Sequence, residues 1–136
     1  MRIWIVLLAL CVAVPTGAVV AQQASKYVGH ETCNGCHPDI HKEWSKTAHA
    51  RAFDLLVNVG QQKTAECLPC HTTGYGSGGY VDEASTSLLQ GVVCEACHGP
   101  GADHAGSMDK SKIQRVPSGK TCGACHQKSN IHSLPK

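Results

Sequence analysis

The stretch Cys94-Glu95-Ala96-Cys97-His98 holds two cysteines three positions apart and a histidine directly after the second. The same C-x-x-C-H spacing occurs four times in the 136-residue chain. The other three copies are Cys33-Asn34-Gly35-Cys36-His37, Cys67-Leu68-Pro69-Cys70-His71 and Cys122-Gly123-Ala124-Cys125-His126. Paired C-x-x-C alone would also fit a zinc site or a redox-active disulfide, but neither needs the histidine. The repeat therefore predicts four sites of covalent haem c attachment, each with two thioether bonds and an axial histidine nitrogen.

These motifs name the predicted cofactor-binding residues. The residues predicted to form the thioether bonds are Cys33, Cys36, Cys67, Cys70, Cys94, Cys97, Cys122 and Cys125. The proximal iron ligands are His37, His71, His98 and His126. The chain has nine histidines, so five remain for the four distal positions: His30, His41, His49, His104 and His132. Met108 is the only methionine after the first residue, and bis-histidine ligation gives lower potentials than His/Met ligation, so we expect a low-potential electron carrier.

The first 21 residues are typical of a secretory signal peptide, with Arg2 ahead of a short apolar run and small residues before a cleavage site after Ala21. An uncleaved N-terminal anchor is the alternative. Cleavage would remove Cys11 and leave the eight motif cysteines in an exported domain over residues 22–136. Export suits haem c, which bacteria attach outside the cytoplasm. The part after residue 21 contains no stretch long enough to span a membrane.

Composition indicates a small domain organised by bound cofactors. Hydrophobic residues make up 42% of the chain, but many of them lie in the first 21 residues, and aromatic residues make up only 4%. A domain this small is marginal without staples or metals, so we expect the haems to supply much of its apolar interior. The formal net charge of +2 is too small for a nucleic-acid-binding domain.

Local patterns constrain the distal ligands. Pro38 to about Val57 is predicted to form one helix, because Pro38 suits the first position and Gly60 follows as a stop. His41 then lies one turn beyond His37 and cannot easily reach the opposite side of the haem that His37 holds. His49 follows two turns further along, near the same face, so this helix could carry ligands to neighbouring haems. We expect Trp44 to pack against a porphyrin.

Three segments between the motifs are predicted to be loops. The glycine-rich run at 74–79 is expected to be flexible, and it lacks the ending of a phosphate-binding loop. Residues 98–104 are expected to form a tight turn that could swing His104 onto another haem. The basic segment 109–120 is interpreted as a solvated linker, in preference to a docking patch.

Several stretches resemble the tetrahaem cytochrome c-554 family. The resemblance runs from Tyr27 to about His126 and is carried by Tyr27-Val28-Gly29, Trp44, Ser45-Lys46-Thr47-Ala48-His49-Ala50, Cys67 to Tyr75 and Gly91 to Gly101. It implies a mainly α fold with extensive loops, that is, a small multihaem cytochrome c fold wrapped around four covalently attached and closely stacked haems. Members of this family are periplasmic electron carriers whose partners are other redox proteins.

The same resemblance implies roles for the distal histidines. His49 would serve the third haem and His104 the first, with His41 as a candidate for the fourth. In the family's namesake the second haem lacks a sixth ligand, and here His30 or His132 could fill that position. Related small multihaem chains polymerise into extracellular filaments, and a spare histidine such as His30 would suit a ligand lent to the next subunit.

The sequence thus favours a periplasmic or extracellular electron-transfer protein over two alternatives. One is a haem enzyme that reduces a small nitrogen oxide at an open five-coordinate iron. The excess of histidines over distal positions argues against it, and the chain has no other catalytic constellation. The other is a polymerising conductive subunit, which would need stacked haems at opposite ends of the molecule.

Overall fold

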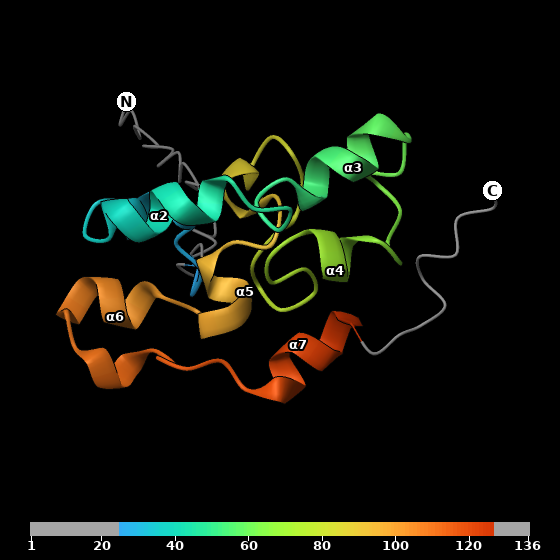
Figure 1. The fold of residues 1–136 in the computed structure, drawn as a ribbon. Helices are drawn as coiled ribbons and strands as arrows, with labels where there is room; N and C mark the ends of the chain where they lie inside the picture. Colours follow the sequence, from blue (N-terminus) through green and yellow to red (C-terminus); the bar gives the residue numbers. More distant parts are fainter. Residues whose placement is uncertain (1–24, 127–136) are drawn as a thin grey trace, which may run out of the picture.

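Short helices joined by long loops make up residues 25–126, the part of the chain that the computed structural model describes (Figure 1). The helices are α1 (His30–Asn34), α2 (Pro38–Ser45), α3 (Ala52–Asn58), α4 (Leu68–His71), α5 (Cys94–His98), α6 (Ala102–Ser107) and α7 (Gly119–His126), with single 3₁₀ turns η1 (Ser87–Leu89) and η2 (Lys110–Lys112). Within these residues the β structure is one isolated antiparallel bridge between Thr72 and Gln90. The expected mainly α architecture with extensive loops is confirmed. The predicted signal peptide and His132 lie outside the described residues.

The helix predicted from Pro38 to about Val57 is wrong in its middle. It begins at Pro38 as expected, but α2 ends at Ser45 and α3 begins only at Ala52. The Thr47 hydroxyl donates to the Trp44 carbonyl (2.7 Å) and accepts from the Ala50 amide (3.3 Å), so a side chain takes over the hydrogen bonding that would extend the helix. His49 therefore lies in a bend and does not share a helix face with His41.

The predicted stop after this region is confirmed. Helix α3 ends at Asn58, and Gly60 has a φ of 71°, which a glycine adopts at no steric cost. The backbone amides of Gly60 and Gln61 donate to Val57 (3.1 Å) and Leu56 (2.8 Å) and so use carbonyls that the helix leaves unpaired.

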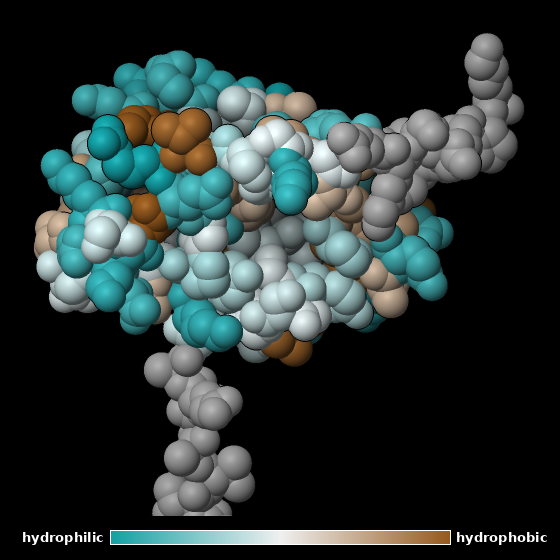
Figure 2. Space-filling view, turned by 90° about the horizontal axis from the view of Figure 1, so that it is seen from below, coloured by the Kyte–Doolittle hydropathy of each residue, from teal (hydrophilic) through white to brown (hydrophobic). Residues whose placement is uncertain are grey.

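A small apolar core joins α3 to the segments around the second and third motifs. Its buried members are Phe53, Leu56, Leu68, Tyr80, Leu89 and Val93, with Tyr27, Trp44, Cys67 and Tyr75 packed at its edge. Other large apolar side chains of the described part, such as Ile40, Leu55 and Val116, remain exposed. The face seen in Figure 2 is mostly hydrophilic or of intermediate hydropathy, with hydrophobic residues in separate spots. The protein chain alone therefore buries little apolar surface.

Thr73 ties the loops around this core together. Its side chain is fully buried, and its hydroxyl donates to the Gly91 carbonyl (2.9 Å) and accepts from the Val93 amide (3.0 Å). Its own amide donates to the Leu89 carbonyl (2.9 Å). The segment that follows the second motif is thus fastened to the segment that leads into the third.

The glycine-rich loop at 74–79 is a compact turn. The amides of Ser77 (2.9 Å) and Gly79 (3.0 Å) both donate to the Gly74 carbonyl. Gly74 has a φ of 75°, and a Cβ there would lie 2.7 Å from the ring of Tyr27. Glycine is therefore required at this position by both backbone conformation and packing.

A buried carboxylate fastens the N-terminal segment to the third motif. Glu95 is 2% exposed and accepts hydrogen bonds from the backbone amides of Val28 (3.0 Å), Gly29 (2.9 Å) and Gly101 (2.7 Å). Hydrogen bonds to an ionised acceptor are about twice as strong as neutral ones. One side chain of the third motif thus holds the entrance to α1 and the turn that leads into α6.

Candidate haem-attachment sites

Each C-x-x-C-H motif forms a helical turn. In the first two motifs the histidine amide donates to the carbonyl of the first cysteine, over 2.8 Å for His37 and 3.2 Å for His71. Helix α5 contains the whole third motif, and α7 contains the whole fourth. Positions i, i+3 and i+4 share one face of a helix. Each turn therefore presents two sulfur atoms and one imidazole on the same side, as attachment to one porphyrin requires.

The motif cysteines are accessible. Cys36 and Cys122 are exposed, and the other six are half-buried. The motifs therefore present their sulfur atoms where a porphyrin can reach them.

Two proximal histidines are oriented by backbone carbonyls. Nδ1 of His71 lies 2.6 Å from the Ala52 oxygen, and Nδ1 of His98 lies 2.6 Å from the Gln114 oxygen. A carbonyl can only accept, so Nδ1 carries the hydrogen in both rings. The lone pair of each neutral imidazole then lies on Nε2, the arrangement found in histidines that ligate a metal. The residues present thus fit haem c in donor type and in orientation.

The carbonyls of Ala52 and Gln114 were not found by sequence reasoning. Gln114 lies in the segment interpreted as a solvated linker, yet its amide also donates to the His98 carbonyl (3.1 Å). Gln114 therefore holds both the side chain and the backbone of His98. Every residue has a backbone carbonyl, so the identities of Ala52 and Gln114 could not indicate that they orient a histidine.

The attachment helices follow one another in space in a different order from the sequence. Helix α1 contacts α5, α5 contacts α7, and α7 contacts α4. Figure 1 shows α4 and α5 near the middle of the molecule, with α7 below them. The motifs thus lie in the order first, third, fourth, second.

The first and third motifs meet through their leading cysteines. The side chains of Cys33 and Cys94 interact, and this interaction lowers the pKa of Cys94 to about 7 and raises the pKa of Cys33. Burial also raises the pKa of Cys97, and Cys122 of the fourth motif adds to that shift. The sulfur atoms of the first, third and fourth motifs thus lie close to one another.

His49 lies beside the proximal histidine of the fourth motif. Its ring centroid is 5.9 Å from that of His126, with the two planes at 62°. The bend that ends α2 is held there by the Val92 amide, which donates to the His49 carbonyl (3.0 Å). The resemblance implied the third haem for His49, whereas the structure brings it to the fourth motif.

His104 lies on α6, where a tight turn was expected; the turn comprises only residues 99–101. Its Nδ1 lies 3.0 Å from the Asp109 carbonyl oxygen, the same arrangement as in His71 and His98. Met108 follows α6 in the left-handed conformation and is 65% exposed.

His30 and His41 lie against each other. Nδ1 of His30 is 3.0 Å from Nε2 of His41, and the ring of Trp44 lies beside both. Burial holds the pKa of His30 below its usual value, against the Glu31 carboxylate, which raises it. Trp44 also reaches the core and donates from Nε1 to the Val92 carbonyl (3.0 Å).

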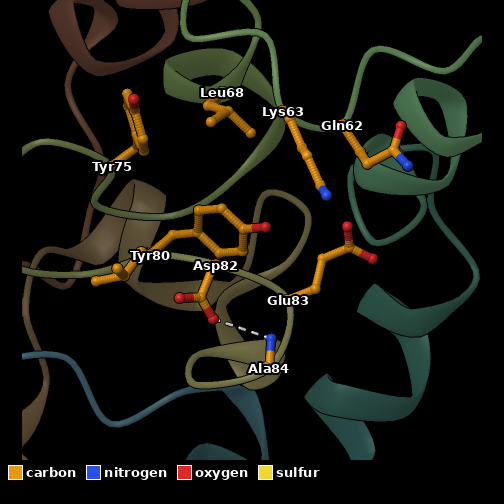
Figure 3. A pocket seen from close by; sticks show the side chains of 9 residues that line it. Gln62, Lys63, Leu68, Tyr75, Tyr80, Asp82, Glu83 and Ala84 are labelled. Carbon is orange, nitrogen blue, oxygen red and sulfur yellow. Dashed lines mark hydrogen bonds between the residues drawn. The ribbon is translucent and has the colours of Figure 1, made fainter.

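A cavity of about 380 Å³ adjoins the second motif (Figure 3). Leu68, Tyr75 and Tyr80 form its apolar wall, and Lys63 and Glu83 point toward one another across its opening. Gln62 also lines it, and the Gln62 side-chain oxygen is buried without a hydrogen-bond partner. Sequence reasoning did not identify this cavity. Leu68 belongs to the second motif, but the lining residues include no thiol or imidazole.

Helical C-x-x-C-H turns with carbonyl-oriented imidazoles define a c-type cytochrome. The chain belongs to the family described as cytochrome c554 and c-prime, whose sequence profile matches residues 32–99. That range includes the first three motifs, whereas the fourth follows it. The family membership inferred from the sequence is confirmed, and with it the small multihaem cytochrome c fold.

The chain is also similar to the cytochrome c-554 of Nitrosomonas europaea, with 34% identity over 110 residues. This match covers 69% of the present chain and 47% of the relative, so the chain spans about half the length of the relative it matches. No solved structure matches the chain significantly. Among the described residues, every helix is too short or too polar to cross a membrane.

Proposed function

We propose that this chain is an exported tetrahaem cytochrome that transfers electrons at low potential in the periplasm or outside the cell. The observation that carries the proposal is the contact of the four attachment helices in the order α1, α5, α7, α4. Four motifs that touch in series place their cofactors close together. Stepwise electron transfer needs such an arrangement, whereas a single catalytic haem does not.

When bound, haem c supplies a one-electron Fe(III)/Fe(II) couple whose potential depends on axial ligands, hydrogen bonds and burial. The chain fixes these variables. The eight motif cysteines anchor the cofactors, and His37, His71, His98 and His126 are the proximal ligands. The carbonyls of Ala52 and Gln114 hold the His71 and His98 rings in one tautomer and increase their basicity as ligands.

We assign His49 as the distal ligand opposite His126. Two imidazoles that bind one metal from opposite sides, each at about 2 Å, have ring centroids about 6 Å apart. The observed 5.9 Å agrees with this value. His104 is the proposed distal ligand of the first haem, as the family resemblance implies, and its carbonyl-bound Nδ1 suits that role. Bis-histidine ligation at these positions supports a low potential.

The proposal is tested on the full chain produced in a bacterium that has a haem c maturation system. Pyridine haemochrome absorbance and the intact mass should give four haems per chain, and removal of residues 1–21 should show in the same mass. Electron paramagnetic resonance of the oxidised protein should show low-spin iron, and a redox titration should give negative potentials. Fewer than four haems would refute the tetrahaem assignment.

Either of two further results would contradict the carrier function and support one of the alternatives. A high-spin haem that binds carbon monoxide and turns over a small nitrogen oxide would establish the enzyme. Ordered filaments in negative-stain micrographs of the purified protein would establish the polymerising subunit. A monomer that exchanges electrons with other redox proteins and has no turnover supports the carrier.

A further inference from the structure

A cluster of metal-ligating side chains flanks the first attachment turn, with His30 and Glu31 on α1 and His41 on α2. Nδ1 of His30 is 3.0 Å from Nε2 of His41 and 3.4 Å from a carboxylate oxygen of Glu31. One ligand atom from each of the three residues lies within 4.8 Å of the other two. We propose that His30, His41 and Glu31 bind a divalent transition-metal ion of the zinc type, with water completing the coordination.

The distances suit tetrahedral coordination. Zinc binds imidazole nitrogen at 2.0–2.1 Å and carboxylate oxygen at about 2.0–2.2 Å, so neighbouring ligand atoms lie about 3.3 Å apart. The nitrogen–nitrogen distance needs to open only slightly, and the nitrogen–oxygen distance already matches. Two imidazoles on one tetrahedral ion have ring centroids about 5 Å apart. The rings of His30 and His41 are 5.2 Å apart.

The protein holds both rings in place before an ion arrives. The Trp44 ring lies 5.1 Å from His30 and 5.2 Å from His41, measured between centroids. Trp44 is itself fixed by its hydrogen bond to the Val92 carbonyl and by the core. The His30 side chain is only 21% exposed, whereas Glu31 is 52% exposed and leaves the cluster open to solvent on one side. Such packing around the ligands lowers the entropy lost on binding.

This pair differs from the histidines assigned to haem. In His71, His98 and His104, Nδ1 donates to a backbone carbonyl. In His30 and His41, two ring nitrogens face each other and share one hydrogen. On metal binding that hydrogen moves to the outer nitrogen of its own ring, and both facing lone pairs become ligands. Service as distal ligands of two haems would instead require the rings to separate.

Calorimetric titration of the purified holoprotein with Zn²⁺ tests the site. We expect one ion per chain, loss of this binding in His30→Ala and His41→Ala, and affinity lowered more than about tenfold in Glu31→Gln, since even outer partners of metal ligands contribute that much. Glu43→Gln is the matched control, because Glu43 is an exposed carboxylate on α2 that pairs with Lys46 (2.7 Å). That control should bind Zn²⁺ like the wild type.

The haem spectrum of each variant distinguishes this site from axial ligation. The spin state of every haem should be the same in His30→Ala and His41→Ala as in the wild type. A new high-spin haem in either variant would show that the histidine is an axial ligand and would overturn the proposal. Zn²⁺ binding that is absent, or that survives in both alanine variants, would also overturn it. If His41→Ala lowers the haem content, His41→Gln keeps the volume and gives the same test. The haem count itself reports on the tetrahaem assignment and is independent of these outcomes.

Discussion

The imidazole rings of His49 and His126 lie with their centroids 5.9 Å apart and their planes at 62°. One ring belongs to the bend between α2 and α3, and the other closes the fourth motif at the end of α7. The fourth cofactor is thus expected to lie between the two histidines.

Replacing His49 by alanine should open the sixth position of that one haem. With the proximal histidine as its one remaining axial ligand, the iron of this haem should be five-coordinate and high-spin. We therefore expect one high-spin haem per chain and carbon monoxide binding to its reduced form. Electron paramagnetic resonance and a carbon monoxide titration measure both effects. His104→Ala is the comparison, because it should open a different haem with a distinct spectrum. Uniformly low-spin iron in His49→Ala would show that another group holds the position.

Gly91 controls the same ligand through the backbone. It has a φ of 79°, and a Cβ there would lie 2.7 Å from the Ala50 carbonyl oxygen, next to His49. Gly91→Ala should cost more than the about 1–2 kcal/mol of a left-handed alanine, because the bend must also move. It should also produce part of the high-spin signal seen in His49→Ala.

Gly76→Ala is the matched control for this change. Gly76 has a φ of 72°, but a Cβ there would meet nothing within 4 Å. Its cost in thermal unfolding should be limited to the backbone conformation, and its haem spectrum should not change. Equal effects of the two substitutions would mean that contact with the bend is unimportant.

Glu95→Ala should destabilise the holoprotein by about 3 kcal/mol or more. The change leaves the amides of Val28, Gly29 and Gly101 without the buried carboxylate that accepts from them, and each unsatisfied buried group costs about 1–3 kcal/mol. Denaturant unfolding monitored by circular dichroism measures the loss. Glu66→Ala, at an exposed position, should change the free energy of unfolding by no more than about 0.5 kcal/mol.

The fourth motif, which lies beyond the family match at residues 32–99, can be tested by mass. Replacing Cys122 and Cys125 together by alanine should lower the intact mass by one haem, apart from the small change in side chains. Thioether bonds survive denaturation, so the mass counts attached cofactors directly. An unchanged haem count would remove this motif from the attachment sites.

The sequence predicted what depends on short-range chemistry. Motif spacing predicts the attachment residues. Pro38 marked the start of a helix, and Gly60 marked the stop after Val57, although the region between them forms two helices. The helix break at residues 46–51 was missed because the apolar periodicity continues through it. The break depends on the Thr47 hydroxyl and on Val92, which is far away in sequence.

Other parts of the site depend on tertiary contacts that no local pattern reveals. Glu95 looked like a variable position within a motif, yet it is buried among three amides from two distant segments. The contact between Cys33 and Cys94 and the pairing of His49 with His126 likewise join motifs that are not neighbours in sequence. The count of histidines identified the candidate distal ligands. The motif histidine that each of them faces depends on the fold.

The spatial order of the attachment helices has a consequence for modularity. Because α1 contacts α5 and α4 contacts α7, any cut between residues 71 and 94 separates both of these pairs. The two halves of the chain are therefore not two smaller cytochromes joined end to end. They interleave, and neither half keeps its neighbours without the other. The smallest unit that can be transplanted into another protein is the whole domain.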